Sequence, residues 1–405
     1  MKRIFLILGF ISCVAGMGFA ASAEDLEIYM YLYNNSRSVT DQYAILTVLQ
    51  TLKLNGAGEF YATALNRLVN QYPNIQRSAP VLEKTAADDL AQTLSALLGE
   101  EKYTTAAPDL WRTIGAFTAP NVKAEALIAL GKMRATDFLP QVVRILQDLN
   151  SAPPAGREEA DSKGKIARGA IIALEKFRDP SGYLPVFFMA TGGYPDSVKQ
   201  LAKATLPVIL EDPSAPLTEV IRSASYPYSI KFLALQTEEE ANIGSQPKAG
   251  VAVAALSEGW RAATNDVRQR QDLLRIRKTS IDMIKRYSTT DPAVYPLLER
   301  SFKEGGDDNE KLDSITALAA LGSEDAVKLL SSFLQITTGR YASQTNNRSD
   351  EALIRSLINN LGVSAANVSG PVRESAKSSL RSVGAVPNLT PAVKNLASDA
   401  LTKLN

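Results

Sequence analysis

A run of basic residues between positions 267 and 287 is the first candidate for chemistry in this sequence. The segment VRQRQDLLRIRKTSIDMIKRY carries seven basic and two acidic residues. A surface of this kind can bind an anionic partner such as a phosphate, a lipid headgroup or an acidic protein. The side chains that we select as a candidate anionic-partner surface are Arg268, Arg275, Lys278 and Lys285.

The same segment has a simpler interpretation, which we favour: it is the solvated face of an amphipathic helix. Arg268 and Asp272 stand four residues apart, as do Lys278 and Asp282. Arg286 follows Asp282 at the same spacing, and opposite charges so placed on a helix partly neutralise one another. The buried stripe of this helix would consist of Leu273, Ile276, Ile281 and Ile284.

Acidic residues cluster at 158–161, 238–240 and 307–310. Two carboxylates that face each other across a cleft can hydrolyse glycosidic bonds, and carboxylates are also ligands for calcium. These clusters lie in polar contexts without neighbouring aromatic residues, and the last lacks the spacing of a calcium-binding loop. We interpret all three as solvated charge and assign no catalytic or metal-binding residue.

The sequence contains no histidine, and its one cysteine is Cys13. Serine and cysteine hydrolase triads and ordinary zinc sites need these residues and are therefore excluded. No glycine-rich phosphate or dinucleotide motif is present. We expect a protein that is not an enzyme and has no cofactor, with chemistry based on carboxylates alone as a remaining alternative. Trp111 and Trp260 lie in apolar segments, where we expect them to pack in the structure.

The first 23 residues have the layout of a secretory signal peptide. Lys2 and Arg3 precede an apolar run, and Ala21, Ser22 and Ala23 match a small-x-small cleavage site. We expect cleavage after Ala23 and export, most simply to the periplasm of a bacterium. The alternatives are an uncleaved N-terminal anchor and a lipoprotein modified at Cys13.

The charges in the rest of the chain are balanced. Removing Lys2 and Arg3 from the 44 basic residues leaves 42, against 43 acidic residues. Proteins that bind nucleic acids usually carry a basic surplus, so we expect no nucleic-acid partner. After residue 23 no apolar run approaches the roughly 18–20 residues that span a bilayer, and membrane association is the less favoured alternative.

Apolar residues from position 38 onward recur at three- and four-residue spacing, which predicts an all-α protein. One pattern of small residues followed by leucine recurs at 122–130, 166–174, 198–206, 313–321 and 372–380. Small residues three apart form a thin stripe on which a neighbouring helix can pack closely. Asp137, Asp179, Asp291 and Asp325 stand at or near the turns between helices, where an aspartate can cap the next helix.

A helix, an aspartate turn and a second helix make a unit that repeats every roughly 30–45 residues, as in α-solenoids. The Val-Lys/Arg-x-x-Ala-x-x-small-Leu runs and the aspartate turns resemble the HEAT repeat family, most clearly over 120–210 and 280–335. The resemblance implies a right-handed α-α superhelix of the HEAT/armadillo kind. It also implies a protein-binding face on the second helices, which include 138–148, 183–190 and 293–303. Between residues 38 and 405 we count about nine helix pairs.

The predicted domains are a signal peptide at 1–23, an N-terminal cap segment at 24–37 and a solenoid at 38–405. In the cap segment tyrosines alternate with aliphatic residues, and a period of two residues is typical of a β-strand. We nevertheless favour a capping helix over an extended segment. Two polar stretches, 151–165 and 337–350, are predicted to be loop insertions.

These observations lead us to expect a non-catalytic scaffold or adaptor of the periplasm or envelope, which binds other proteins through an extended solenoid face. The first alternative is a membrane-surface tether or lipid-binding module that uses Cys13 or the basic segment. A carboxylate-based enzyme that acts on envelope polysaccharide is the second alternative.

Overall fold

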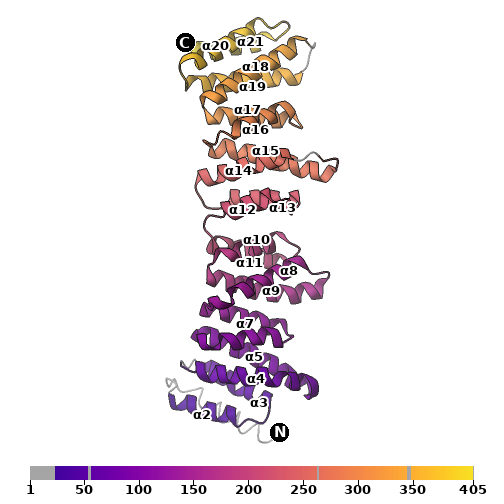
Figure 1. Ribbon diagram of the computed structural model, residues 1–405, viewed down its shortest axis with the longest axis vertical. Helices are drawn as coiled ribbons and strands as arrows, with labels where there is room; N and C mark the ends of the chain where they lie inside the picture. Colours follow the sequence, from indigo (N-terminus) through magenta and orange to yellow (C-terminus); the bar gives the residue numbers. More distant parts are fainter. Residues whose placement is uncertain (1–22, 53–55, 262–263, 344–347, 405) are drawn as a thin grey trace. The chain divides into compact units, whose positions relative to one another are not determined.

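The computed structural model describes residues 23–52, 56–261, 264–343 and 348–404. Within these ranges the chain forms twenty α-helices, three short 3₁₀ helices and no strands, which confirms the predicted all-α fold (Figure 1). Residues 1–22 of the predicted signal peptide, which include Cys13, lie outside the described residues. By its internal contacts the chain divides into two units, Met1–Leu210 and Glu211–Asn405.

Unit 1 consists of helix pairs stacked in two layers. Each even-numbered helix packs on the odd-numbered helix that follows it, and the odd-numbered helices α3 to α11 also pack on one another in order. In the other layer, α4 contacts α6 and α8 contacts α10. The helices are α2 (Ala23–Asn34), α3 (Val39–Leu52), α4 (Gly58–Ser78), α5 (Val81–Glu101), α6 (Ala107–Ala116), α7 (Pro120–Met133), α8 (Leu139–Ser151), α9 (Arg157–Phe177), α10 (Tyr183–Thr191) and α11 (Asp196–Ile209).

Unit 2 repeats this arrangement. Even-numbered helices pack on the odd-numbered helices that follow them, and each layer is continuous from its first helix to its last. The helices are α12 (Ser214–Arg222), α13 (Tyr228–Glu240), α14 (Ser245–Arg261), α15 (Val267–Tyr287), α16 (Val294–Glu304), α17 (Asp308–Leu321), α18 (Glu324–Ser343), α19 (Arg348–Ala366), α20 (Gly370–Gly384) and α21 (Pro391–Leu404).

Glycine and alanine bring the odd-numbered helices of unit 1 close together. A Cβ atom added to Gly99 of α5 would lie 2.8 Å from the Cα atom of Ala129 in α7. A Cβ atom added to Gly131 of α7 would lie 2.5 Å from the Cα atom of Ala173 in α9. The small-residue stripe that the sequence predicts is therefore the line of contact between neighbouring helices of this layer.

The buried leucines confirm the predicted repeat register in four helices and correct it in a fifth. The leucines that end the pattern in α7, α9, α11 and α20 are buried, and they are Leu130, Leu174, Leu206 and Leu380. In α17 the register is wrong, because Ala320 is exposed and the fully buried leucine is Leu318. Helix α17 ends at Leu321 and Gly322 follows in a left-handed conformation, so the predicted positions fall in the last turn.

Two of the four predicted aspartates, Asp179 and Asp291, cap the turns where they lie, whereas Asp325 lies inside α18 and Ser323 caps that helix by accepting the Ala326 N–H group at 3.1 Å. The Asp179 side chain accepts a hydrogen bond from the Ser181 N–H group at 2.9 Å, and Asp291 accepts one from the Ala293 N–H group at 2.9 Å.

These turns join different helices from those that pack as pairs. The turn at Asp137 lies in the 3₁₀ helix η2 (Thr136–Phe138), which joins α7 to α8. Helix α7 packs on α6, and α8 packs on α9. Each such turn therefore leads the chain out of one pair and into the next.

The cap segment is helical, as we favoured from the sequence. Helix α2 packs on α3, and the ring of Tyr33 is buried edge-to-face on Phe60 with the centroids 5.1 Å apart. With α2 and α3, the described residues form ten helix pairs. The prediction of about nine pairs from residue 38 onward is confirmed by the nine pairs from α4 to α21, and the cap helix α2 with α3 adds the tenth.

The two predicted loop insertions are mostly helical. Helix α9 begins at Arg157, where Glu159 pairs with Lys163 at 2.6 Å and Asp161 pairs with Lys165 at 2.8 Å. Pairs at this spacing support a helix even where the sequence is polar throughout. Helix α18 extends to Ser343 and α19 begins at Arg348, so these helices occupy most of the second stretch, and residues 344–347 lie outside the described ranges.

None of the helices in the described part of the chain is both long enough and apolar enough to cross a bilayer.

Candidate functional site

The four cations selected from the sequence lie on one face of α15. Positions 268, 275, 278 and 285 fall within about 100° of one another around a helix with 3.6 residues per turn. Arg268, Arg275 and Lys285 are exposed, and Lys278 is half-buried. The structure therefore brings the candidate anionic-partner surface together.

Arg275 is already engaged within the protein. Its guanidinium group lies 3.6 Å from Asp272 and stacks on the ring of Phe232 in α13 at 4.1 Å. The predicted partner of Asp272 was Arg268. That arginine is exposed and forms no ion pair with any residue that the structure describes.

Lys278 is also neutralised, although not by the predicted partner. Its ammonium group lies 3.6 Å from Asp307, which precedes α17, whereas Asp282 pairs with Arg286 at 2.7 Å as predicted. Lys285 is exposed and has no ion-pair partner among the described residues. Of the four cations, only those near the two ends of α15 keep an unneutralised charge.

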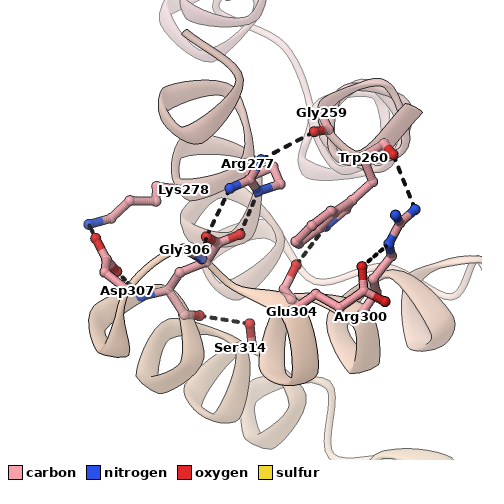
Figure 2. Close-up of polar contacts among 11 residues, drawn as sticks. Gly259, Trp260, Arg277, Lys278, Arg300, Glu304, Gly306, Asp307 and Ser314 are labelled. Atoms are coloured by element: carbon pink, nitrogen blue, oxygen red, sulfur yellow. Dashed lines mark hydrogen bonds and ion pairs between the residues drawn. The ribbon is translucent and has the colours of Figure 1, made fainter. Parts of the chain in front are cut away.

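Arg277, on the inner side of α15, is the centre of a polar cluster that Figure 2 shows. Its Nε and Nη2 atoms donate hydrogen bonds to the Glu310 carboxylate at 2.6 and 3.1 Å, and its Nη1 atom donates to the Gly259 carbonyl at 3.3 Å. Two parallel bonds from one guanidinium group to one carboxylate form a strong and directional contact. This contact fastens α15 to α17.

Glu310 is fully buried, so the interpretation of cluster 307–310 as solvated charge is wrong for this residue. Its carboxylate also accepts the Gly306 N–H group at 2.9 Å, and Asp307 accepts the Glu310 N–H group at 2.7 Å (Figure 2). An acidic residue that caps a helix with glutamate three positions later resembles a capping box. That spacing was visible in the sequence and is the signal that sequence reasoning missed.

The indole of Trp260 lies between two guanidinium groups (Figure 2). Arg277 and Arg300 lie 4.2 and 4.8 Å from the ring centroid, and the indole Nε1 atom donates to the Ser301 hydroxyl at 2.9 Å. Arg300 also donates to the Trp260 carbonyl at 3.1 Å and to Glu304 at 2.9 Å. Trp260 is thus a packing residue, as the sequence suggested, and it joins α14, α15 and α16.

The electrostatics beside α15 follow from burial and from the nearby cations. Burial raises the pKa of Asp313 on α17, while the charges of Lys278 and Lys285 oppose the rise. No three metal-binding side chains gather anywhere in the described ranges. The chemistry that this surface can perform is anion binding by Arg268 and Lys285, with salt bridges holding the rest of the face together.

Two of the three segments predicted to carry a protein-binding face lie in one layer of unit 1, and the third lies in unit 2. Segments 138–148 and 183–190 correspond to α8 and α10, which contact each other, and 293–303 corresponds to α16 of unit 2. Next to α8, the half-buried rings of Trp111 and Phe138 lie against each other with centroids 5.9 Å apart. Trp111 is thus packed on one side and accessible on the other.

The fold defines a repeat-like array of helix pairs. No protein-family model matches the chain, and no curated protein matches it. One similar solved structure is described as the crystal structure of an engineered protein from the Northeast Structural Genomics Consortium. It is 13% identical, has a TM-score of 0.25, and the match covers 93% of this chain and 98% of that chain.

Proposed function

We propose that the protein is a non-catalytic scaffold or adaptor, exported to the periplasm or envelope, whose HEAT-like helical array binds other proteins. The observation that carries the proposal is the stacking of helix pairs in two layers within each unit. Stacked repeats present a broad surface built from equivalent helix faces, which suits recognition of a protein or peptide. Export rests on the layout of residues 1–23 alone.

We place the binding face in unit 1 on the layer that contains α6, α8 and α10. Tryptophan is enriched among the residues that dominate binding energy at protein interfaces. Trp111 is half-buried, so a partner can cover its remaining surface while Phe138 holds the ring in place. Tethering of lipid by α15 is the weaker proposal, because two of the four cations on that face already have acidic partners.

Site-specific crosslinking in cells that make the protein tests this assignment. A photoreactive amino acid replaces Arg144 on α8 or, as the matched control, Arg168 on α9; both arginines are exposed. We expect a discrete protein adduct from position 144, no such adduct from position 168, and loss of the adduct when Trp111→Ala is added.

The same adduct from both positions, or none from either, would contradict the proposed face. An adduct that survives Trp111→Ala would remove Trp111 from the interface and leave the layer as the binding surface. Circular dichroism of each variant shows that the helical array is intact.

A further inference from the structure

The tripeptide Asp-Pro-Ser occurs twice and folds in the same way both times. At 179–181, the Asp179 Oδ1 atom accepts hydrogen bonds from the N–H group and the hydroxyl group of Ser181, at 2.9 and 2.6 Å. At 212–214, the Asp212 Oδ1 atom accepts the same two bonds from Ser214, at 3.0 and 2.6 Å. The first copy precedes α10 and the second begins α12.

The second copy differs from the first in one contact. The Oε1 atom of Glu238, on α13, lies 2.6 Å from the Ser214 Oγ atom. Glu238 is fully buried, and its Oε2 atom has no hydrogen-bond partner among the described residues. In the first copy, Asp179 is the only side chain among the described residues that forms a hydrogen bond with Ser181.

A serine hydroxyl carries one hydrogen and can donate to only one acceptor along a short, linear bond. Ser214 nevertheless lies 2.6 Å from two carboxyl oxygens. The first copy shows where its hydrogen goes, because Ser181 has only the aspartate to donate to. If the Ser214 hydroxyl donates its hydrogen to Asp212, the short contact between the Ser214 Oγ atom and the Glu238 Oε1 atom needs a second hydrogen. That hydrogen comes from the Glu238 carboxyl group.

We propose that Glu238 is protonated near neutral pH and donates to Ser214, so that Glu238, Ser214 and Asp212 form a proton-dependent latch. The latch holds residues 212–214 to α13. This segment lies between α11, the last helix of unit 1, and α12, the first helix of unit 2. All three latch residues belong to unit 2, so protonation of one buried side chain controls how firmly the start of α12 is anchored to α13.

The surroundings of Glu238 favour the neutral acid. Burial is the largest influence and raises the pKa of Glu238; hydrogen bonding with Ser214 lowers it, the charge of Asp212 raises it and the charge of Lys248 lowers it. The Lys248 ammonium group, from α14, donates to the Glu239 carbonyl at 2.7 Å. From α15, Arg286 bonds the Glu239 carboxylate. Both of these cations therefore bond groups of Glu239, and neither forms a hydrogen bond with the Glu238 carboxyl group.

Deprotonation opens the latch. The O–H bond of Glu238 breaks, the proton passes to water and the electron pair stays on Oε1. Two carboxylates then compete for the single hydroxyl hydrogen of Ser214. Because the folded pKa is raised, the stabilisation is complete below the unfolded value of about 4.3 and is lost as pH rises through the folded pKa.

Hydrogen exchange of the Ser214 and Leu217 backbone amides, which bond the Asp212 carboxylate and the Pro213 carbonyl, tests the latch on the full chain. In the wild type we expect protection factors, corrected for intrinsic exchange, to fall by up to about tenfold per pH unit between about 4.3 and the folded pKa of Glu238, and to level off above it. Glu238→Gln keeps a donor to Ser214 without a charge, so its protection should not change with pH. Ser181→Ala is the matched control and should leave the response of the Ser214 and Leu217 amides unchanged.

A flat wild-type profile, or the same pH response in Glu238→Gln, would overturn the proposal. A second readout is carbon-13 NMR of the glutamate side-chain carboxyl groups in the wild type, with the Glu238 signal identified by its absence from Glu238→Gln. The assignment is needed because burial also raises the pKa of Glu125. We expect Glu238 to titrate well above the ordinary value of about 4.3. Titration of Glu238 near that value would show that it is ionised at neutral pH and would also overturn the latch.

Discussion

At the scale of single residues, burial separates charges that look alike in the sequence. Glu310 and Glu304 both bond an arginine side chain, but Glu310 is fully buried whereas Glu304 is exposed. A buried carboxylate depends on its partner, because removing that partner leaves an uncompensated charge away from water. An exposed ion pair contributes little, because water solvates both groups when they separate.

This contrast predicts unequal effects of two substitutions in the cluster of Figure 2. Arg277→Met should lower the free energy of unfolding by about 3–5 kcal/mol, because it strands the Glu310 carboxylate. Glu304→Gln, the control, should change it by less than about 1 kcal/mol. Urea unfolding followed by circular dichroism measures both. Equal, small losses would show that Glu310 does not carry a buried charge.

At the scale of helices, close approach depends on positions that have no side chain. Gly131 faces the backbone of Ala173, which cannot move without shifting the whole of α9. Gly250, in contrast, is exposed within α14 and has open space around it. Alanine favours helix over glycine by about 1 kcal/mol, so the same substitution should have opposite effects at the two sites.

We therefore predict that Gly131→Ala destabilises the protein and Gly250→Ala stabilises it. The clash at position 131 outweighs the helix propensity and should cost about 1–3 kcal/mol, as overpacking does. Alanine at position 250 should add about 0.5–1 kcal/mol. Thermal unfolding of both variants provides the comparison. An increase in stability from Gly131→Ala would mean that α7 and α9 are not in close contact.

At the scale of the whole molecule, the chain forms two units, each with its own buried residues. Leu130 lies in the core of unit 1 and Leu318 in the core of unit 2, and both are completely buried. Helices in a repeat array contact mainly their neighbours, so the effect of a cavity is greatest in nearby repeats. The two leucines therefore probe the two units separately.

Leu130→Ala should cost about 2–4 kcal/mol and reduce hydrogen-exchange protection in the helices of unit 1. Leu318→Ala should have the same effect on unit 2, with unit 1 unchanged. Exchange measured by mass spectrometry on peptides from both units distinguishes the outcomes. Equal loss of protection across both units in either variant would show that the chain unfolds as one cooperative structure.

Local patterns in the sequence predicted several features of this fold. The three- and four-residue spacing predicted helices, and the small residues before Leu130 and Leu174 predicted where those helices meet. Both follow from helix geometry, which sets which neighbours along the chain share a face. The polar composition at the start of α9 predicted a loop, whereas the four-residue spacing of its opposite charges supports the helix that forms there.

The sequence alone determined that this protein is helical, built from repeated pairs, and without histidine chemistry. Only the tertiary structure decided that Glu310 belongs to Arg277, that Glu238 meets Ser214, and that α8 pairs with α9. These partners stand 33 and 24 residues apart in the first two cases. Periodicity reports only on near neighbours along the chain, whereas burial and ion pairing depend on which helices pack together.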